Sequence, residues 1–335
     1  MADGTARRSP SMYDVADRAG VSHQTVSRVV NGFDNIRPET RDRVLTAISE
    51  LGYRRNSAAR TLATRRSGAI GVLAPAVSDY GPTSTVQSID AAARAAGFHP
   101  LITTTPDDLA SIAAGLEFLL DQSVEALVVV APQHGIGGLL QHLDVTVPIA
   151  TLQSGDLGPG TAISFDQSAG AALAMAHLRE LGHHEIQHVA GPEHFFEAEA
   201  RRRSYERALD GAGIPIPEIV AGDWTAESGY RAARAIAPQT TAVFSANDQM
   251  ALGLIHAFRD AGLDVPRDVS VVGFDDIPEA AHFWPPLTTV RQDFAEIGRR
   301  AVALLLGELR GELSLNHDQI LPELIVREST APPDL

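Results

Sequence analysis

The chain has 335 residues, of which 44% are hydrophobic and 21% charged, so it can form more than one domain with its own core. It contains no cysteine, which excludes disulfide bonds and thiolate metal sites. No apolar run reaches the roughly 18 residues of a membrane span, and the N-terminus has no apolar signal region, so the sequence predicts a cytoplasmic protein without a membrane partner.

Charge is distributed unevenly along the chain, whose formal net charge is −15. The first 66 residues contain 12 arginines and 7 acidic residues, a net charge of +5, while the remainder carries −20. A basic N-terminal part on an acidic body is expected to turn its basic part toward a polyanion such as DNA.

Two short helices around a tight turn are predicted near the N-terminus. The first places Val15, Ala16 and Ala19 on one face and ends at Gly20, and the second begins at Ser22, a residue that favours helix N-caps. The second helix presents a row of polar side chains to solvent: His23, Gln24, Thr25, Ser27, Arg28 and Asn31. Such a row is typical of helices that enter the DNA major groove, although an ordinary helical hairpin also has a polar face.

A third amphipathic helix is predicted over Pro38 to Leu51, with proline at its start and an apolar face. Three helices in about fifty residues favour a compact DNA-binding unit over a simple hairpin. After it, Asn56 could cap a short helix over 57–63, which would be too short to be stable alone in water. A solvated linker is the alternative interpretation of that segment.

From Ala69 onward, apolar runs alternate with helical patterns, which predicts parallel sheets covered by helices on both faces. The expected strands are 70–74, 127–130, 186–190, 243–246 and 269–274. The expected helices are 83–96, 107–121, 168–181, 198–212, 226–236 and 247–261. The fold class is therefore α/β, with a helix-turn-helix headpiece followed by two doubly wound lobes.

Polar residues follow several of these strands, where ligands bind in open α/β sheets. Asn247 and Asp248 follow one strand, Asp275 and Asp276 follow another, and Trp224 follows a short strand near Val220. Asparagine and aspartate can bind a vicinal diol, and tryptophan can stack on the apolar face of a sugar. The alternatives are helix caps for the acidic residues, an N-cap for Asn247 and a core position for Trp224.

Several stretches together resemble the LacI/GalR family of bacterial transcription regulators. They are Tyr13-Asp-Val-Ala16 with residues 21–31, Asn247 to Gly253, Val271 to Asp276, and Pro285 to Thr289 with residues 292–294. The resemblance implies a helix-turn-helix headpiece at 10–54, a hinge helix or linker at 55–68, and an effector-binding and dimerisation domain at 69–335. That last domain would have the periplasmic-binding-protein fold.

The same resemblance places the N-lobe at about 69–165 and 294–320, and the C-lobe at about 166–290 and 321–330. The chain would cross between the lobes near Phe165, at 289–294 and near Leu321. A dimer is expected and not a tetramer, because the sequence ends at Leu335 without the heptad-like tail of tetrameric members.

The resemblance also implies partners and site residues. Double-stranded, near-palindromic operator DNA would be bound by Tyr13, Ser22, His23, Gln24, Thr25, Ser27, Arg28, Asn31, Ala59 and Leu62. Leu62 would insert into the minor groove beside Ala59. A small sugar would be bound by Asp79, Gln153, Phe165, Arg201, Trp224, Asn247, Asp275, Gln292 and Phe294, with Tyr80, Gly81 and Pro82 on the adjacent loop. No cofactor or metal is expected.

Three residues depart from a closely related member of that family. Gln153 replaces a cleft aspartate, Glu197 replaces a serine that precedes the cleft arginine, and His23 replaces a base-contacting tyrosine. The preferred sugar and the operator sequence are therefore expected to differ.

A sugar-responsive repressor, and not an enzyme, is the function that these features favour, with a galactoside-like sugar as the expected effector. A free solute-binding protein would need a signal segment, and an enzyme would need a nucleophile or an acid/base pair in a supporting motif. A regulator using a different sugar, or one whose ligand strengthens DNA binding, remains an alternative.

Overall fold

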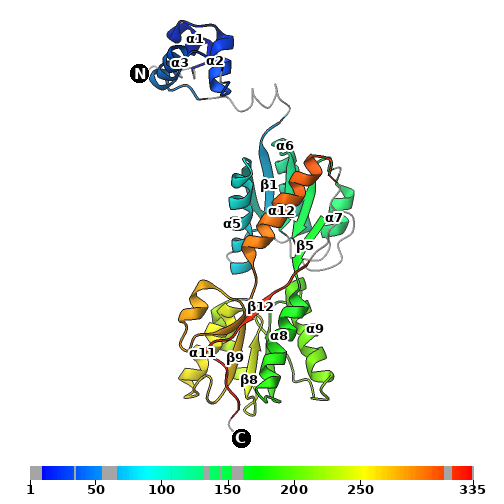
Figure 1. Ribbon diagram of the computed structural model, residues 1–335. Coiled ribbons are helices and arrows are strands. Elements are labelled where there is room, and N and C mark those ends of the chain that lie inside the picture. Colours follow the sequence, from blue (N-terminus) through cyan, green and yellow to red (C-terminus); the bar gives the residue numbers. More distant parts are fainter. Residues whose placement is uncertain are drawn as a thin grey trace, which may run out of the picture. The chain divides into compact units, whose positions relative to one another are not determined.

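The computed structural model describes residues 10–33, 35–54, 66–77, 79–106, 108–130, 136–143, 145–152, 161–312 and 319–333. The chain divides into two compact units at Ser67–Gly68. Figure 1 shows a small all-helical N-terminal unit and a larger unit built of two lobes. In the part of the chain that the structure describes, no helix is long and apolar enough to cross a membrane.

The N-terminal unit consists of α1 (Met12–Ala19), α2 (His23–Val30) and α3 (Pro38–Leu51). Ser11 begins α1 with a reciprocal capping box to Asp14, and Gly20 ends it in the left-handed conformation at φ 62°. The Ser22 hydroxyl then caps α2 by accepting from the Thr25 backbone N–H. The three predicted helices are confirmed.

A single small core holds these helices together. Its fully buried members are Val15, Ala16, Ala19, Val26, Val29, Val44 and Ala47, with Met12, Val21, Val30, Ile36, Ile48, Leu51 and Tyr53 packed around them. Small residues dominate, which lets the helices approach closely. Because the apolar faces of the helices pack into this core, the polar face of α2 points away from it.

The larger unit contains two six-stranded sheets. In the first, the strand order is β11-β5-β4-β3-β1-β2, and in the second it is β12-β10-β9-β8-β6-β7. Among the described strands, neighbours pair in parallel, except that β12 is antiparallel to β10. The first sheet comprises β1 (Ala69–Pro75), β2 (His99–Thr105), β3 (Ala126–Val130), β4 (Ile149–Leu152), β5 (Thr161–Phe165) and β11 (Gln319–Ile320). The second comprises β6 (Ile186–Ala190), β7 (Val220–Ala221), β8 (Ala242–Ser245), β9 (Ser270–Asp275), β10 (Thr288–Arg291) and β12 (Glu323–Ile325).

Helices cover both sheets, as the alternating pattern predicted. The N-lobe carries α5 (Tyr80–Ala95), α6 (Leu109–Asp121), α7 (Ile136–His142) and α12 (Phe294–Leu309). The C-lobe carries α8 (Gln167–Glu180), α9 (Phe196–Asp210), α10 (Ala226–Ala232) with the 3-10 turn Ala233–Ala235, α11 (Asp248–Asp260) and the 3-10 turn Pro278–His282. The α/β class with an N-terminal helical headpiece is confirmed.

The chain passes between the lobes three times. It leaves the first sheet after β5, returns after β10 to form α12, and passes again between β11 and β12. Figure 1 shows these connections running side by side where the two lobes meet. The carboxyl ends of strands from both lobes lie at this meeting point, which is the position where open α/β sheets bind ligands.

Several short strands and edge strands were not predicted. The edge strand β2 alternates between exposed and half-buried residues and contains Pro100, so it lacks the continuous apolar run that marks β3 or β6. The short strand expected near Val220 is present as β7, whereas β11, also of two residues, is too short for any periodicity and was not predicted. Tertiary pairing creates these strands, because their local sequence does not specify them.

Candidate functional site: a cleft between the lobes and a polar helix face

A cavity of about 780 Å³, partly open to solvent, lies between the two lobes. Eight of the nine predicted effector residues line it, namely Asp79, Phe165, Arg201, Trp224, Asn247, Asp275, Gln292 and Phe294. Gln153 lies outside the described residues. The other lining residues are Tyr80, Gly81, Pro82, Thr85, Val130, Leu152, Ser164, Gln167, Phe195, Glu197 and Ile297.

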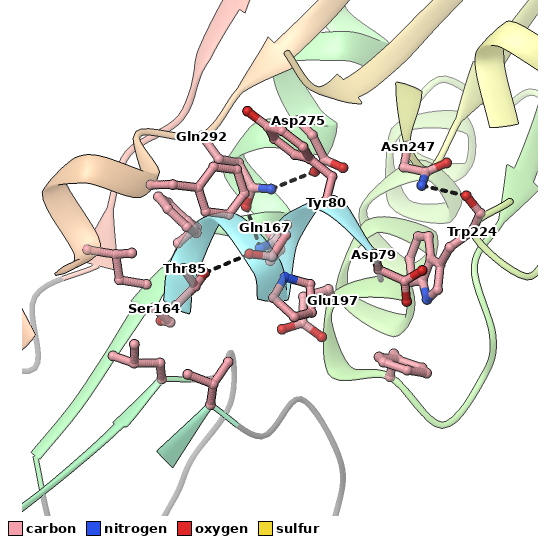
Figure 2. Close-up of a pocket in the computed structure, with 18 of the residues that line it drawn as sticks. Asp79, Tyr80, Thr85, Ser164, Gln167, Glu197, Trp224, Asn247, Asp275 and Gln292 are labelled. Atoms are coloured by element: carbon pink, nitrogen blue, oxygen red, sulfur yellow. Dashed lines mark hydrogen bonds between the residues drawn. The ribbon is translucent and has the colours of Figure 1, made fainter. Parts of the chain in front are cut away.

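A closed chain of polar contacts forms one wall of this cavity (Figure 2). Arg201 Nε donates to Gln167 Oε1 at 2.9 Å, and Gln167 Nε2 donates to Gln292 Oε1 at 2.8 Å. Gln292 Nε2 donates to Asp275 Oδ1 at 2.7 Å, which in turn lies 3.7 Å from Arg201 Nη2. Each of the four side chains comes from a different element, so the network fixes them relative to one another.

Burial distinguishes Arg201 from the two arginines that follow it. Arg201 is 4% exposed, whereas Arg202 and Arg203 form exposed i,i+4 ion pairs on the outer side of α9. Its guanidinium lies 3.8 Å from the centre of the Phe274 ring, a cation–π contact, and Nη1 donates to the Ala246 carbonyl at 2.5 Å. Burial lowers the pKa of Arg201 but leaves it charged.

Asp275 is the carboxylate that faces this guanidinium. It is the last residue of β9, is 7% exposed, and has a backbone φ of 111°. Burial raises its pKa to about 6, while Arg201 and the Gln292 hydrogen bond oppose the shift. Its hydrogen bond and its ion pair both use Oδ1. Within the described chain, the second carboxylate oxygen therefore remains available to a ligand.

Aromatic side chains form the apolar walls of the cavity. Phe294 meets Tyr80 edge-on at 5.5 Å between ring centres, and it meets Phe165 in the same manner at 5.3 Å. On the opposite lobe, Trp224 packs edge-on against Phe195 at 5.9 Å. A cavity with apolar rings and a small number of fixed polar groups suits a ligand with both apolar and hydroxylated faces.

Trp224 and Asn247 are coupled. The Asn247 Oδ1 caps α11 by accepting from the Met250 N–H, while its Nδ2 donates to the Trp224 carbonyl and to Gln249 Oε1. The amide of Asn247 is thus engaged within the protein, and one of its roles is to fix Trp224, whose backbone φ is 72°. The N-cap interpretation and the cavity-lining interpretation of Asn247 therefore apply together.

The two other acidic residues that follow these strands have structural roles, as expected. Asp248 is fully buried and accepts from Thr289 Oγ1 and the Ile277 N–H. Asp276 forms ion pairs with Arg291 and Arg327. Neither lines the cavity.

Gln167 was not predicted as a site residue, although it connects Arg201 to Gln292. It is the first residue of α8, directly after the first crossing. A single glutamine at a helix start gives no distinctive sequence signal. Thr85, Ser164 and Phe195 were also missed, because their positions depend on how the lobes face each other and not on a local pattern.

The second candidate site is the polar face of α2 in the N-terminal unit. Gln24, Arg28 and Asn31 are exposed, while His23, Thr25 and Ser27 are half-buried. His23 stacks on the exposed ring of Tyr13, with ring centres 4.8 Å apart and planes inclined by 12°. This contact joins the start of α2 to α1.

The remaining polar side chains of α2 are ordered by local contacts. The Ser22 hydroxyl lies 2.9 Å from Thr25 Oγ1, and Asn31 Nδ2 donates to Ser27 Oγ at 3.3 Å. Arg28 lies 5.8 Å from the centre of the Phe33 ring. Ala59 and Leu62, the predicted hinge residues, lie outside the described residues.

Comparison with known proteins shows which family combines a helical N-terminal unit with a two-lobed α/β unit. A model of the bacterial regulatory proteins of the lacI family matches residues 11–56, and one of the periplasmic binding protein-like domain matches 175–330. The lactose operon repressor of Escherichia coli K12 is 35% identical over 326 residues, covering 96% of this chain and 90% of that protein. The chain belongs to the lacI family.

Solved structures of this lacI family agree in fold over nearly the whole chain. A lac repressor dimer bound to operator and the anti-inducer ONPF matches with a TM-score of 0.89 and 32% identity, over 97% of this chain and all of that one. A complex of the regulator CelR with cellobiose matches with a TM-score of 0.71 and 32% identity, over 96% and 99%. These relatives are DNA-binding regulators and not enzymes.

Proposed function

We propose that this lacI-family regulator is a homodimeric repressor that binds a near-palindromic operator and responds to a small neutral sugar, galactoside-like in character. The α2 face carries the operator-contacting residues, and the cavity between the lobes binds the sugar. The lac repressor structure bound to operator and ONPF is a dimer, and CelR was solved with cellobiose, which supports this assignment.

The polar network around Arg201 and Asp275 is the observation that carries the sugar assignment. A buried guanidinium, a carboxylate and two amides lie opposite aromatic rings in one cavity. Carboxylates and amides satisfy adjacent hydroxyls, and the rings pack against C–H faces. A planar purine would stack on the rings but presents no adjacent hydroxyls to this carboxylate and these amides.

The three crossings between the lobes supply a route for control. A ligand that touches both lobes binds one lobe arrangement better than another, and this difference shifts the equilibrium between them. The proposed hinge around Ala59 and Leu62 would transmit that shift to the operator. We propose that sugar binding lowers operator affinity.

The decisive experiment is operator binding measured with and without defined ligands. An operator would first be selected from random DNA with the full chain. Fluorescence anisotropy would then follow release by lactose, methyl β-galactoside, cellobiose, methyl β-glucoside and hypoxanthine. Release by lactose or methyl β-galactoside, and not by hypoxanthine, supports the proposal. Tight binding of hypoxanthine, or tighter operator binding with ligand, would refute it.

A different sugar is the second candidate. CelR, at 32% identity, was solved with cellobiose, and Gln153 stands where the family resemblance implies a cleft aspartate. Loss of a carboxylate changes which ring hydroxyl is preferred. In the same anisotropy series, release by cellobiose but not by lactose or methyl β-galactoside would favour this alternative.

A further inference from the structure

Glu197 is a carboxyl group in the cavity that stands apart from the polar network around Arg201. It is the second residue of α9, one helical turn before Arg201, and it lines the cavity. Figure 2 shows its carboxyl group beside Gln167.

The Glu197 Oε2 is buried and has no hydrogen-bond partner among the described residues. Arg201 does not supply one, since its Nε and Nη1 donate to Gln167 and Ala246 and its Nη2 faces Asp275. A buried carboxyl oxygen without a partner is costly, and native proteins satisfy such atoms with protein groups, water or ligand. Here the residue that carries the unpartnered atom lines the cavity between the lobes.

The charges around Glu197 decide what kind of group would satisfy it. The described lining residues include three carboxyl groups, on Asp79, Glu197 and Asp275, against the single guanidinium of Arg201. A cavity with this excess of acceptors and negative charge favours hydrogen-bond donors on the ligand and disfavours carboxylates or phosphates.

Protonation of Glu197 follows from the same surroundings. Burial raises its pKa to about 7 and Asp275 adds to the rise, while its own backbone N–H and Arg201 oppose it. Asp79, across the cavity at the start of α5, also has its pKa raised by burial. Glu197 therefore exchanges its proton near neutral pH, and a ligand donor would stabilise the ionised form.

We propose that Glu197 is a specificity-determining residue that accepts a hydrogen bond from a donor group of the effector, a hydroxyl or an ammonium. This inference rests on the proposed sugar site and names the polar group by which this chain selects its sugar. Because binding favours the ionised carboxyl, effector binding releases a proton, and affinity rises with pH.

The test is calorimetry on the full chain with the five ligands of the anisotropy series plus two matched pairs, galactosamine with galactose and glucosamine with glucose. For the sugar that binds wild type most tightly, E197Q is expected to weaken binding about tenfold, because an amide replaces a charge-assisted acceptor. Wild-type affinity is expected to rise about tenfold from pH 6 to pH 8. The sugar affinity of E197Q is expected to keep only the smaller pH dependence that comes from Asp275.

The matched control is E199Q on the same helix, since Glu199 pairs with Arg203 on the outer side and does not line the cavity. It is expected to bind sugar like wild type. An amino sugar that binds more tightly than its hydroxyl analogue, with this preference lost in E197Q, identifies the donor as ammonium; the reverse preference identifies a hydroxyl.

Two negative results are distinguishable. If wild type binds a sugar and E197Q, folded by its melting temperature, has the same affinity and pH profile, the role of Glu197 is refuted and the sugar site stands. If wild type binds none of the sugars, the proposed function fails and this inference with it.

Discussion

Arg201 is one of three consecutive arginines, and its burial is what gives it a role different from its neighbours. The buried guanidinium contacts Phe274, Gln167 and Asp275, so its loss would leave several buried groups without partners. The outer two arginines pair with glutamates in solvent, where ion pairs contribute little.

The cleanest residue-scale test of the cleft is Asp275→Asn. Asparagine keeps the acceptor for Gln292 and tolerates the positive φ of 111°, so the fold should be retained. The charge opposite Arg201 is lost, and we expect sugar affinity to fall by about 1–3 kcal/mol or more. Calorimetry measures this loss, with melting temperature and operator binding as controls. Undiminished sugar binding would contradict the assignment.

Arg28 lies on the exposed face of α2, where we expect it to contact a base of the operator. Arginine binds the guanine edge with two hydrogen bonds, which a phosphate contact does not require. Arg28→Ala should therefore cost about 1–3 kcal/mol on the selected operator and little on random DNA. Anisotropy with both duplexes measures the difference. Equal losses on the two would show that Arg28 contacts only phosphate.

Some residues of the cavity could be predicted from the sequence, and others could not. Trp224 and Asp275 could be found because each follows a strand in a pattern that places it at a ligand-binding edge. Gln167 could not, since its importance arises from contacts to Arg201 and Gln292 that lie 34 and 125 residues away. Long-range contacts of this kind have no local signature.

Helices and strands also differ in whether the sequence predicts them. Helices with a clear apolar face and a recognisable start or end residue, such as α1 to α3, were predicted. Edge strands such as β2 were missed, because half of their residues face solvent and their pairing is set by the neighbouring strand β1.

The contact between α10 and α11 depends on Gly253. A Cβ added there would lie 1.9 Å from the Ala226 carbonyl oxygen and 2.6 Å from the Tyr230 nitrogen, both backbone atoms that cannot move independently. Gly253→Ala should destabilise the C-lobe by about 1–3 kcal/mol or more. The control is Gly138→Ala on α7, where a Cβ meets nothing within 4 Å. Thermal unfolding compares them, and equal melting temperatures would refute the prediction.

The proposed hinge helix provides the other prediction at this scale. A segment of seven residues, 57–63, is too short to form a stable helix alone, so we expect it to fold on operator DNA. Leu62→Ala should weaken specific operator binding while sugar affinity is unchanged. Hydrogen exchange at 57–63 should be fast in the free protein and slow on the operator. Slow exchange already in the free protein would exclude coupled folding.

At the scale of the whole molecule, the basic N-terminal part and the acidic body have distinct electrostatic tasks. The arginines of the first 66 residues favour phosphate, whereas the acidic remainder disfavours nonspecific contact between DNA and the body. This division orients the molecule on DNA without contributing to sequence preference, which depends on base contacts.

We expect binding at the sugar site and binding at the operator site to be coupled. If saturating both sugar sites of the dimer lowers operator affinity by a factor, saturating operator must lower the product of the two sugar-binding constants by the same factor, and we expect about 5- to 150-fold. Anisotropy gives the first factor and calorimetry on the operator complex gives the second. In Asp275→Asn, a sugar concentration just sufficient to saturate wild type should lower operator affinity less than it does in wild type. An operator affinity that does not respond to a sugar bound in the wild-type cleft would refute the coupling, because a ligand shifts only an equilibrium whose two states it binds unequally.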